Sequence, residues 1–514
     1  MFAAVFIPDF PVEAVVRHLD AAAREGAVAV LDGTPPLVHV IATNEKARAL
    51  GAEAGMTKVQ AESVPGLRLK PRSLAQEASA HAALLDCAHG FSPRVESTAA
   101  DTVIVDIGGL EPLFGPPAKI ARELARRAAE IGLEARVGAA ANPDAALHAA
   151  RGFPGITVIP PGKEAARLGE LPVDVLAPSP EILETLDRWG VRTFRGLAAL
   201  PPLAVSERLG QEGLRLQSLA RGETQRPLTP VAESFDFSET LELEEPVGLL
   251  EPLAFLLGRL LEQVCARLDS RALATNELRL TLGLEVHHDV ELDAARESVT
   301  QSAVHQRTLR LPVPMQDSKV FLKLLQLDLN SHPPAAPVKT ITLAAEPVRP
   351  RATQNGLFVP AAPEPERLEL TLARIRKALG DLTGERVGTP QLVNTHRPDA
   401  FRMAHFAPRP PQAAAIPAAK PEPVSALRMF RPALPAKVEL RRGVPAVIFF
   451  NGQRGQVIAA AGPWRSSGNW WNQEPWARDE WDVAVALAQK NETSVGLYRL
   501  YAAQGEWWVE GAYD

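Results

Sequence analysis

The chain has 514 residues and 46% hydrophobic content, which is too long for one core and predicts roughly three to five packed domains. Its net charge of −6 argues against strong nucleic-acid binding by this chain alone, because phosphate contacts supply most of that affinity. Two cysteines are too few for a disulfide framework or a zinc site, and no run of 18 apolar residues predicts a membrane span. We therefore expect a soluble, cytoplasmic, multidomain protein without membrane contact.

Strand and helix signals alternate in the first third of the chain. Five segments carry the pattern, at residues 2–7, 91–109, 118–133, 136–140 and 143–151. The first is an apolar run with Asp9 just beyond its end, and the second is a hairpin in which Asp101 precedes a β-branched run that contains Asp106. The last two segments predict a strand and an alanine-rich helix. This order predicts a split βαβ, ferredoxin-like unit and an α+β fold.

Residues 166–228 read as helical and contain one clear helix–glycine–helix pattern. Arg188, Arg192 and Arg195 surround Gly190 in this pattern. In a helix-hairpin-helix the glycine backbone can approach a DNA phosphate closely, so these residues are candidates for weak DNA binding. A purely structural pair of helices stays open as the alternative, because only one such hairpin is clear.

The second half of the chain changes composition twice. Two helical runs (about 248–268 and 315–329) and strands near 276–284, 305–311 and 338–345 predict a compact, acidic α+β domain. A proline-rich stretch follows, with a short helix near 365–380 and a linker at about 407–435. Residues 437–514 hold seven of the eight tryptophans and all three tyrosines, which can form a small β-rich core or a docking face.

Five sequence anchors stand in the order and spacing of the Y-family (translesion) DNA polymerases, which the chain resembles over about residues 1–345. They are Phe6-Ile7-Pro8-Asp9, Ala47-Arg48 with Gly51 and Gly55-Met56, Ser92-Pro93-Arg94-Val95-Glu96, Val137-Gly138-Ala139-Ala140-Ala141-Asn142, and the helix-hairpin-helix. The resemblance implies a palm at 1–10 and 75–165, fingers at 11–74, a thumb at 166–230 and a little finger at 231–346. The remaining ranges are a proline-rich linker at 347–436 and a tryptophan-rich region at 437–514.

The departures from that family fall on its metal ligands. Such polymerases are similar in holding two magnesium ions with three carboxylates. The first aspartate of the family's Asp-x-Asp falls on Ile7 and the second on Asp9, while its Asp-Glu pair falls on Asp101 and Thr102. Isoleucine cannot coordinate a metal and threonine brings no charge, so the resemblance implies a degenerate site with no catalytic residue, metal or cofactor.

The substrate-binding motifs of that family are also incomplete. Its fingers motif Tyr-x-Ala-Arg reads Glu45-Lys46-Ala47-Arg48, and its palm motif Asn-Lys-x-x-Ala-Lys reads Asn142-Pro143-Asp144-Ala145-Ala146-Leu147. Each lost ligand or phosphate cation costs several kcal/mol of transition-state stabilisation. We therefore expect a pseudo-polymerase. The alternative is an active low-fidelity polymerase, with Asp9, Asp101 and Asp106 as a rearranged metal site.

The degenerate palm and the aromatic tail together resemble one branch of the family, the ImuB-type accessory proteins of bacterial damage-induced mutagenesis cassettes. Three tail segments carry this match, at residues 462–471, 474–482 and 496–501, with residues 395–401 in addition. The resemblance implies an adaptor in the SOS response and DNA repair. Its implied partners are the sliding clamp (beta subunit), an error-prone C-family DNA polymerase and a RecA-like protein of ImuA type.

Two segments are candidates for the adaptor contacts. Gln354, Leu357 and Phe358 resemble the Gln-x-x-Leu-Phe peptides that bind bacterial clamps, and they lie between prolines that favour an extended docking peptide. A chance match of three positions is the alternative. In the tryptophan-rich region, aromatic rings that face outward would suit partner binding. The alternative is that these rings only form the core of a small domain. The predicted docking set is Trp464, Trp470, Trp471, Trp476 and Trp481.

Overall fold

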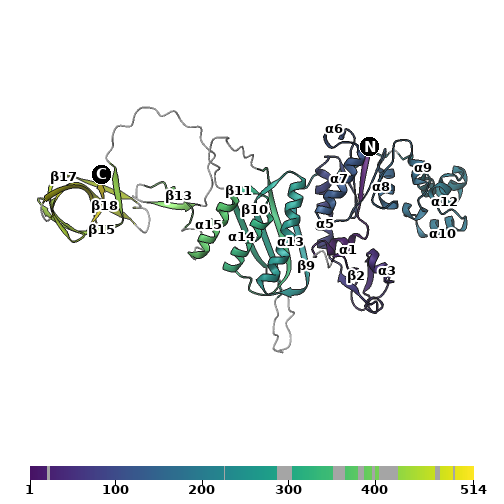
Figure 1. Cartoon of the computed structure of the whole chain (residues 1–514), viewed down its shortest axis with the longest axis horizontal. Coiled ribbons are helices and arrows are strands. Elements are labelled where there is room, and N and C mark those ends of the chain that lie inside the picture. The colour runs from purple at the N-terminus through teal and green to yellow at the C-terminus, as the bar shows by residue number, and fades with distance from the viewer. Residues whose placement is uncertain are drawn as a thin grey trace. The chain divides into compact units, whose positions relative to one another are not determined.

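The computed structural model forms two compact units, Met1–Leu382 and Thr383–Asp514 (Figure 1). The structure describes residues 1–19, 24–224, 226–285, 304–350, 365–379, 387–395, 400–404, 426–468, 470, 475–489 and 492–514. No helix among these residues is both long and apolar enough to cross a membrane.

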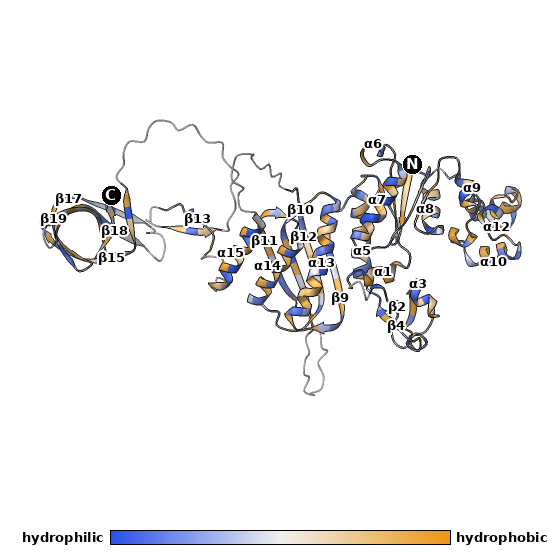
Figure 2. Ribbon diagram, viewed as in Figure 1, coloured by the Kyte–Doolittle hydropathy of each residue, from blue (hydrophilic) through white to orange (hydrophobic). Residues whose placement is uncertain are grey.

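A five-stranded sheet in the order β5-β6-β1-β7-β8 lies at the centre of the palm. Its strands are β1 (Phe2–Phe6), β5 (Val95–Ala99), β6 (Thr102–Asp106), β7 (Arg136–Ala140) and β8 (Ile156–Val158). The strand β1 is hydrophobic along its length (Figure 2) because it pairs on both sides, antiparallel to β6 and β7. The predicted hairpin, β5–β6, is also antiparallel.

Helices cover both faces of this sheet. The palm helices are α5 (Leu74–His89), α6 (Glu111–Phe114), α7 (Pro117–Glu130) and α8 (Pro143–Gly152). Side chains of α5 and α7 share one hydrophobic core with β1, β6 and β7, and α8 packs on the opposite face. The predicted ferredoxin-like order is confirmed. Sequence analysis did not predict α5, because buried polar residues such as Gln76 and Asp86 interrupt its apolar pattern.

The range predicted as fingers contains a small sheet in the order β3-β2-β4. Its elements are α1 (Phe10–Val16), β2 (Ala27–Asp32), β3 (His39–Thr43), α3 (Glu45–Ala49), α4 (Lys58–Glu62) and β4 (Leu67–Pro71). The range predicted as thumb is helical. It contains α9 (Glu164–Leu168), the 3-10 turn η1 (Val173–Leu176), α10 (Pro180–Arg188), α11 (Phe194–Ala198) and α12 (Pro202–Arg221). Gly210 has non-helical backbone angles and divides α12 by a kink.

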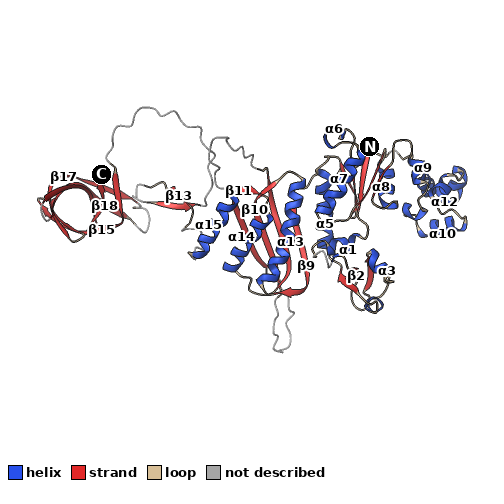
Figure 3. Ribbon diagram, viewed as in Figure 1, coloured by secondary structure: helices blue, strands red, loops and turns tan. Residues whose placement is uncertain are grey.

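Four antiparallel strands in the order β11-β10-β12-β9 form the sheet of the little-finger range. They are β9 (Phe237–Val247), β10 (Ala274–Leu284), β11 (Val304–Met315) and β12 (Val338–Val348). The helices α13 (Leu250–Ser270) and α14 (Ser318–Ser331) pack on one face, and α15 (Pro365–Ala378) follows (Figure 3). The sequence predicted only three of these strands. It missed β9, in which glutamates alternate with the apolar side chains and weaken the apolar signal.

The second unit holds a short hairpin and a closed antiparallel barrel. The hairpin is β13 (Thr389–Leu392) with β14 (Phe401–Ala404). The barrel consists of β15 (Leu427–Arg441), β16 (Val444–Phe450), β17 (Gln453–Gly468), β18 (Trp476–Gln489), β19 (Glu492–Ala503) and β20 (Glu506–Tyr513). Its first strand starts inside the predicted linker, so the boundary at residue 437 is wrong. Pro432 is tolerated in β15 because it lies where the pairing with β20 shifts register, between Met429 and Leu434.

Candidate functional site

The pairing of β1 with β6 brings together three of the four predicted palm-site residues. Phe6 lies opposite Thr102, and the backbone N–H of Ile7 donates to the Asp101 carbonyl oxygen at 2.9 Å. Ile7 and Thr102 are both fully buried, whereas Asp101 is partly exposed. The pairing of β1 with β6 has no register shift, so Ile7, which directly follows β1, lies beside Asp101 as the sequence comparison implied.

Asp101 is contacted by groups of the chain itself. The Thr102 hydroxyl donates to Asp101 Oδ1 at 2.6 Å, and Arg151 Nη2 lies 3.7 Å from the same oxygen. Arg151 Nη2 is also 3.4 Å from Thr102 Oγ1, and its guanidinium lies over the Phe6 ring. The sequence did not single out Arg151, because its distance from Asp101 along the chain gives no signal. Arg151 places a cation beside Asp101, the one aligned metal-ligand position that still holds a carboxylate.

Asp9, the fourth predicted residue, pairs with the fingers. It precedes α1 in a left-handed conformation with φ 52°. Its Oδ1 and Oδ2 accept hydrogen bonds from Arg48 Nη1 and Nη2 at 2.9 and 2.8 Å. Arg48 is the one cation retained from the family's fingers motif, and it forms this bidentate pair with a carboxylate of the same chain.

The rearranged metal triad of Asp9, Asp101 and Asp106 does not form. Asp106 lies opposite Phe2, at the far end of β6 from Asp101, and five residues of strand span about 17 Å. Arg94 pairs with Asp106 at 2.7 Å. Within the ranges that the structure describes, no three His, Cys, Asp or Glu side chains gather where they could hold a metal ion.

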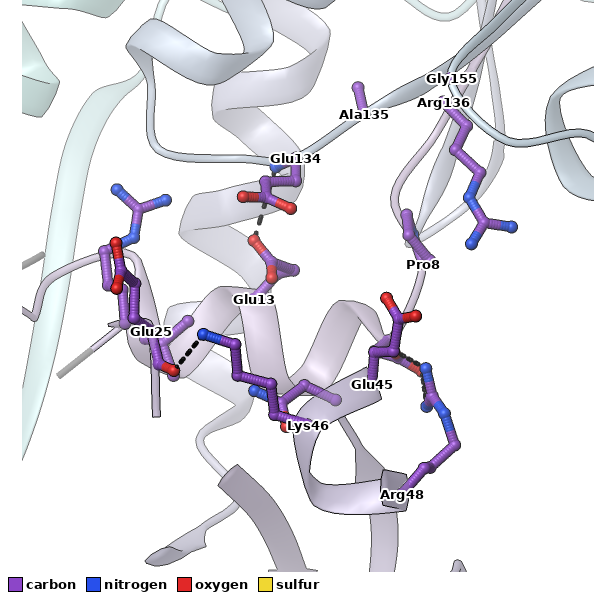
Figure 4. A pocket seen from close by; sticks show the side chains of 14 residues that line it. Pro8, Glu13, Glu25, Glu45, Lys46, Arg48, Glu134, Ala135, Arg136 and Gly155 are labelled. Atoms are coloured by element: carbon purple, nitrogen blue, oxygen red, sulfur yellow. Dashed lines mark hydrogen bonds and ion pairs between the residues drawn. The ribbon is translucent and has the colours of Figure 1, made fainter. Parts of the chain in front are cut away.

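A pocket of about 630 Å³ lies between the fingers helix α3, α1 and the start of β7 (Figure 4). Both carboxylates and cations line it, including Glu13, Glu45, Lys46 and Arg136 (Figure 4). Burial raises the pKa of the Glu13 carboxyl to about 7, while a backbone hydrogen bond from Glu134 at 3.4 Å opposes that rise. A polyphosphate in this pocket would meet carboxylates as well as cations.

The thumb hairpin presents its predicted residues at the surface. Gly190 has φ +70° and no atom near the position of a Cβ, so its backbone is open to approach. Arg188 pairs with Glu184, and Arg192 lies 3.7 Å from Asp187. All three arginines are exposed, Arg195 included. Gly210 makes a second turn of this kind in α12 with φ +64°, which the sequence pattern did not reveal.

The five predicted docking tryptophans divide into different environments. Trp464 is 47% exposed and Trp470 80% exposed, while Trp476 is partly buried. Trp481 is only 5% exposed and packs in the barrel core, so it is a core residue and its assignment to the docking set is corrected. Its strand neighbours Val483 and Val485 point the same way into the core, which follows from the two-residue period of a strand.

Two predicted elements lie outside the described residues. They are Trp471 and the clamp-binding peptide with Gln354, Leu357 and Phe358. On the barrel, sequence reasoning missed a stacked pair, Tyr501 and Trp508, whose ring centroids are 5.1 Å apart, a typical separation for aromatic pairs. They are cross-strand neighbours on β19 and β20.

Comparison with known proteins relates the chain to polymerase-like proteins. Residues 5–151 match the model of the impB/mucB/samB family. Protein ImuB of Caulobacter vibrioides is 26% identical over 410 residues, covering 79% of this chain and 86% of that protein. DNA polymerase IV 2 of Mesorhizobium japonicum is 28% identical over 264 residues, which are 50% of this chain and 62% of that protein.

Solved structures that match the chain include the insertion ternary complex of Dbh DNA polymerase. It has a TM-score of 0.40 and 17% identity, and the match covers 68% of this chain and all of that one. DinB from Sulfolobus solfataricus has a TM-score of 0.39 and 16% identity over 68% of this chain and all of that one. The chain is therefore similar to Protein ImuB over most of its length, and its residues 5–151 match the impB/mucB/samB family model.

Proposed function

We propose that this chain is a non-catalytic adaptor in damage-induced translesion DNA synthesis. It links the sliding clamp to an error-prone C-family DNA polymerase and to a RecA-like protein of ImuA type, and it binds DNA only weakly. Similarity to Protein ImuB over 410 residues supports the class of protein. The partners come from the resemblance, with Gln354, Leu357 and Phe358 contacting the clamp and the aromatic barrel contacting a second protein.

The observation that carries the non-catalytic role is the pairing at Asp101. Two-metal phosphoryl transfer needs carboxylates that are free to bridge two cations about 4 Å apart. Here Ile7 and Thr102 stand at two of the aligned ligand positions, and Arg151 lies 3.7 Å from the third. Asp9 is held by Arg48. The second candidate, an active low-fidelity polymerase, is favoured only by the retained carboxylate of Asp101.

Primer extension with the full chain separates the two candidates. We expect no incorporation with magnesium or manganese, in the parent or in Asp101→Ala. Incorporation by the parent that Asp101→Ala abolishes would overturn the non-catalytic role. Incorporation that survives Asp101→Ala would indicate a contaminating polymerase, which a mock purification identifies.

Clamp and partner binding are tested separately in the same full chain. Gln354→Ala with Leu357→Ala and Phe358→Ala is expected to abolish capture by immobilised clamp, while Trp470→Ala leaves it unchanged. Conversely, Trp470→Ala is expected to weaken co-purification with the C-family polymerase or the RecA-like protein. Undiminished clamp binding by the triple variant would remove the clamp from the proposal.

A further inference from the structure

We propose that a buried charge cluster is a releasable latch that docks the domain of residues 237–348 on the palm. The cluster, called the docking latch below, consists of Arg17, Asp86, Glu239 and Arg267. In the free protein it holds the palm and this domain as one rigid body. The inference does not depend on whether the palm is catalytic, because none of the four residues lies at the Asp101 site.

The docking latch joins two elements of the palm side to two of the domain. Glu239 Oε1 accepts hydrogen bonds from Arg17 Nη2 at 2.9 Å and from Arg267 Nη1 at 3.1 Å. Arg267 Nε donates to Asp86 Oδ2 at 2.8 Å. Arg17 follows α1 and Asp86 lies on α5, whereas Glu239 lies on β9 and Arg267 on α13. No side chain of the four is more than 6% exposed.

Several further contacts beside the latch are also polar, while Ala266 of α13 packs on the hydrophobic core of the palm. Gln263 Nε2 donates to the Arg17 carbonyl oxygen at 2.9 Å, and the Thr240 N–H donates to Ser79 Oγ at 3.2 Å. Arg271 lies 3.4 Å from Asp86. The domain's own core is different, because leucines of α13, α14 and its sheet fill it. The boundary between palm and domain is thus more polar than the interior of either side.

The latch is also incompletely paired. Arg17 Nε and Nη1, Glu239 Oε2 and Gln263 Oε1 are buried and have no hydrogen-bond partner among the described residues. Burying charges costs desolvation energy that their mutual attraction only partly returns, so such a cluster gives specificity more than net stability. Separation of the two faces would return all of these groups to water, while the leucine core of the domain stays intact. These are the properties of a specific contact that can open.

Breaking the latch from the palm side leaves the domain complete. Arg17→Met removes the ion pair between Glu239 and the palm side, but it keeps the ion pair between Glu239 and Arg267. Glu239→Gln removes the charge that both arginines share. The matched control is Glu123→Gln on the exposed face of α7, where Arg126 and Glu123 form a pair at 2.6 Å.

Distances between the palm and the domain report on opening in the full chain. Spin labels at Arg122→Cys on α7 and Lys323→Cys on α14, both exposed positions, are measured by pulsed electron double resonance with Cys265→Ala. Cys87 stays unlabelled because it is 1% exposed and burial raises its pKa to about 12. We expect one narrow distance in the parent and in Glu123→Gln. In Arg17→Met a longer second population should rise at least about tenfold, and more in Glu239→Gln.

Circular dichroism of the same samples distinguishes opening from unfolding. The proposal requires the longer distance to appear with full helix content, and Arg17→Lys to restore most of the narrow population. A single narrow distance in both latch variants would overturn it and make the cluster a fixed core element. A longer distance that appears only as helix content falls would overturn it as well.

Discussion

The palm site and the barrel differ in whether their candidate functional side chains already have partners within the chain. In the palm, the carboxylates of Asp101 and Asp9 face Arg151 and Arg48 of the same chain. In the barrel, the rings of Trp464 and Trp470 are 47% and 80% exposed. A catalytic site needs charged groups that are not neutralised by other side chains of the protein. A docking surface needs apolar side chains that are exposed to solvent rather than buried in the protein's own core. The contrast agrees with the proposed function, in which the barrel binds a partner and the palm catalyses no reaction.

The largest expected effect concerns the two kinds of barrel tryptophan. Trp481→Ala should lower the free energy of unfolding of the barrel by about 3–5 kcal/mol, because it leaves a cavity in the core. Trp470→Ala should change it by no more than about 0.5 kcal/mol. Chemical denaturation followed by fluorescence measures both. Equal losses would mean that the exposed rings also support the fold, and the comparison would fail.

A second prediction rebuilds the palm site. Ile7→Asp with Thr102→Glu adds two carboxylates to that of Asp101, and Arg151→Gln removes the internal cation. Without metal the free energy of unfolding of the variant should fall by at least about 2–3 kcal/mol, because two buried positions, 7 and 102, then carry carboxylates. Manganese at a hundred times its Kd should restore about 2.7 kcal/mol.

Thermal unfolding with and without manganese measures this rescue. The parent, in which Arg151 stays beside Asp101, should show no manganese-dependent shift. An equal shift in the parent would show that its palm still binds the ion, contrary to the comparison.

The third prediction concerns pH and Glu13 in the pocket beside α3. Its pKa rises from 4.5 to about 7 on folding, so the folded state holds this proton more tightly than the unfolded state. Stability should therefore fall as pH rises from about 4.5 to 7, by about 1–3 kcal/mol, and level off above pH 7. Glu13→Gln should remove this fall and be the more stable protein at pH 8. The exposed control Glu53→Gln should leave the pH profile unchanged.

The smallest expected effect is that of the internal cation alone. Arg151→Gln should cost no more than about 1 kcal/mol, because its pair with Asp101 is roughly one-third exposed on each side. Raising the salt concentration should reduce the difference further. A loss above about 3 kcal/mol would show that Arg151 is a packing residue of the palm rather than a surface counter-ion.

The sequence predicted the palm well because its signals are local. An apolar run predicted β1, a β-branched run predicted β6, and an alanine-rich segment after a proline predicted α8. It missed α5 and β9, in which buried polar side chains such as Asp86 and Glu239 interrupt the apolar pattern. These two elements carry half of the docking latch. When a charged residue is buried because it pairs with a residue far away in the sequence, the residues around it show no pattern that predicts the burial.

The sequence by itself determined which groups are missing from the palm, because Ile7 and Thr102 lack the charge that a metal ligand needs. It also located the aromatic residues in the last part of the chain. Only the tertiary structure decided what surrounds the remaining carboxylate and which rings are exposed. Arg151 reaches Asp101 because α8 returns along the sheet, and Trp481 turns inward because the barrel closes. Both depend on contacts between residues far apart in the chain, which no local pattern records.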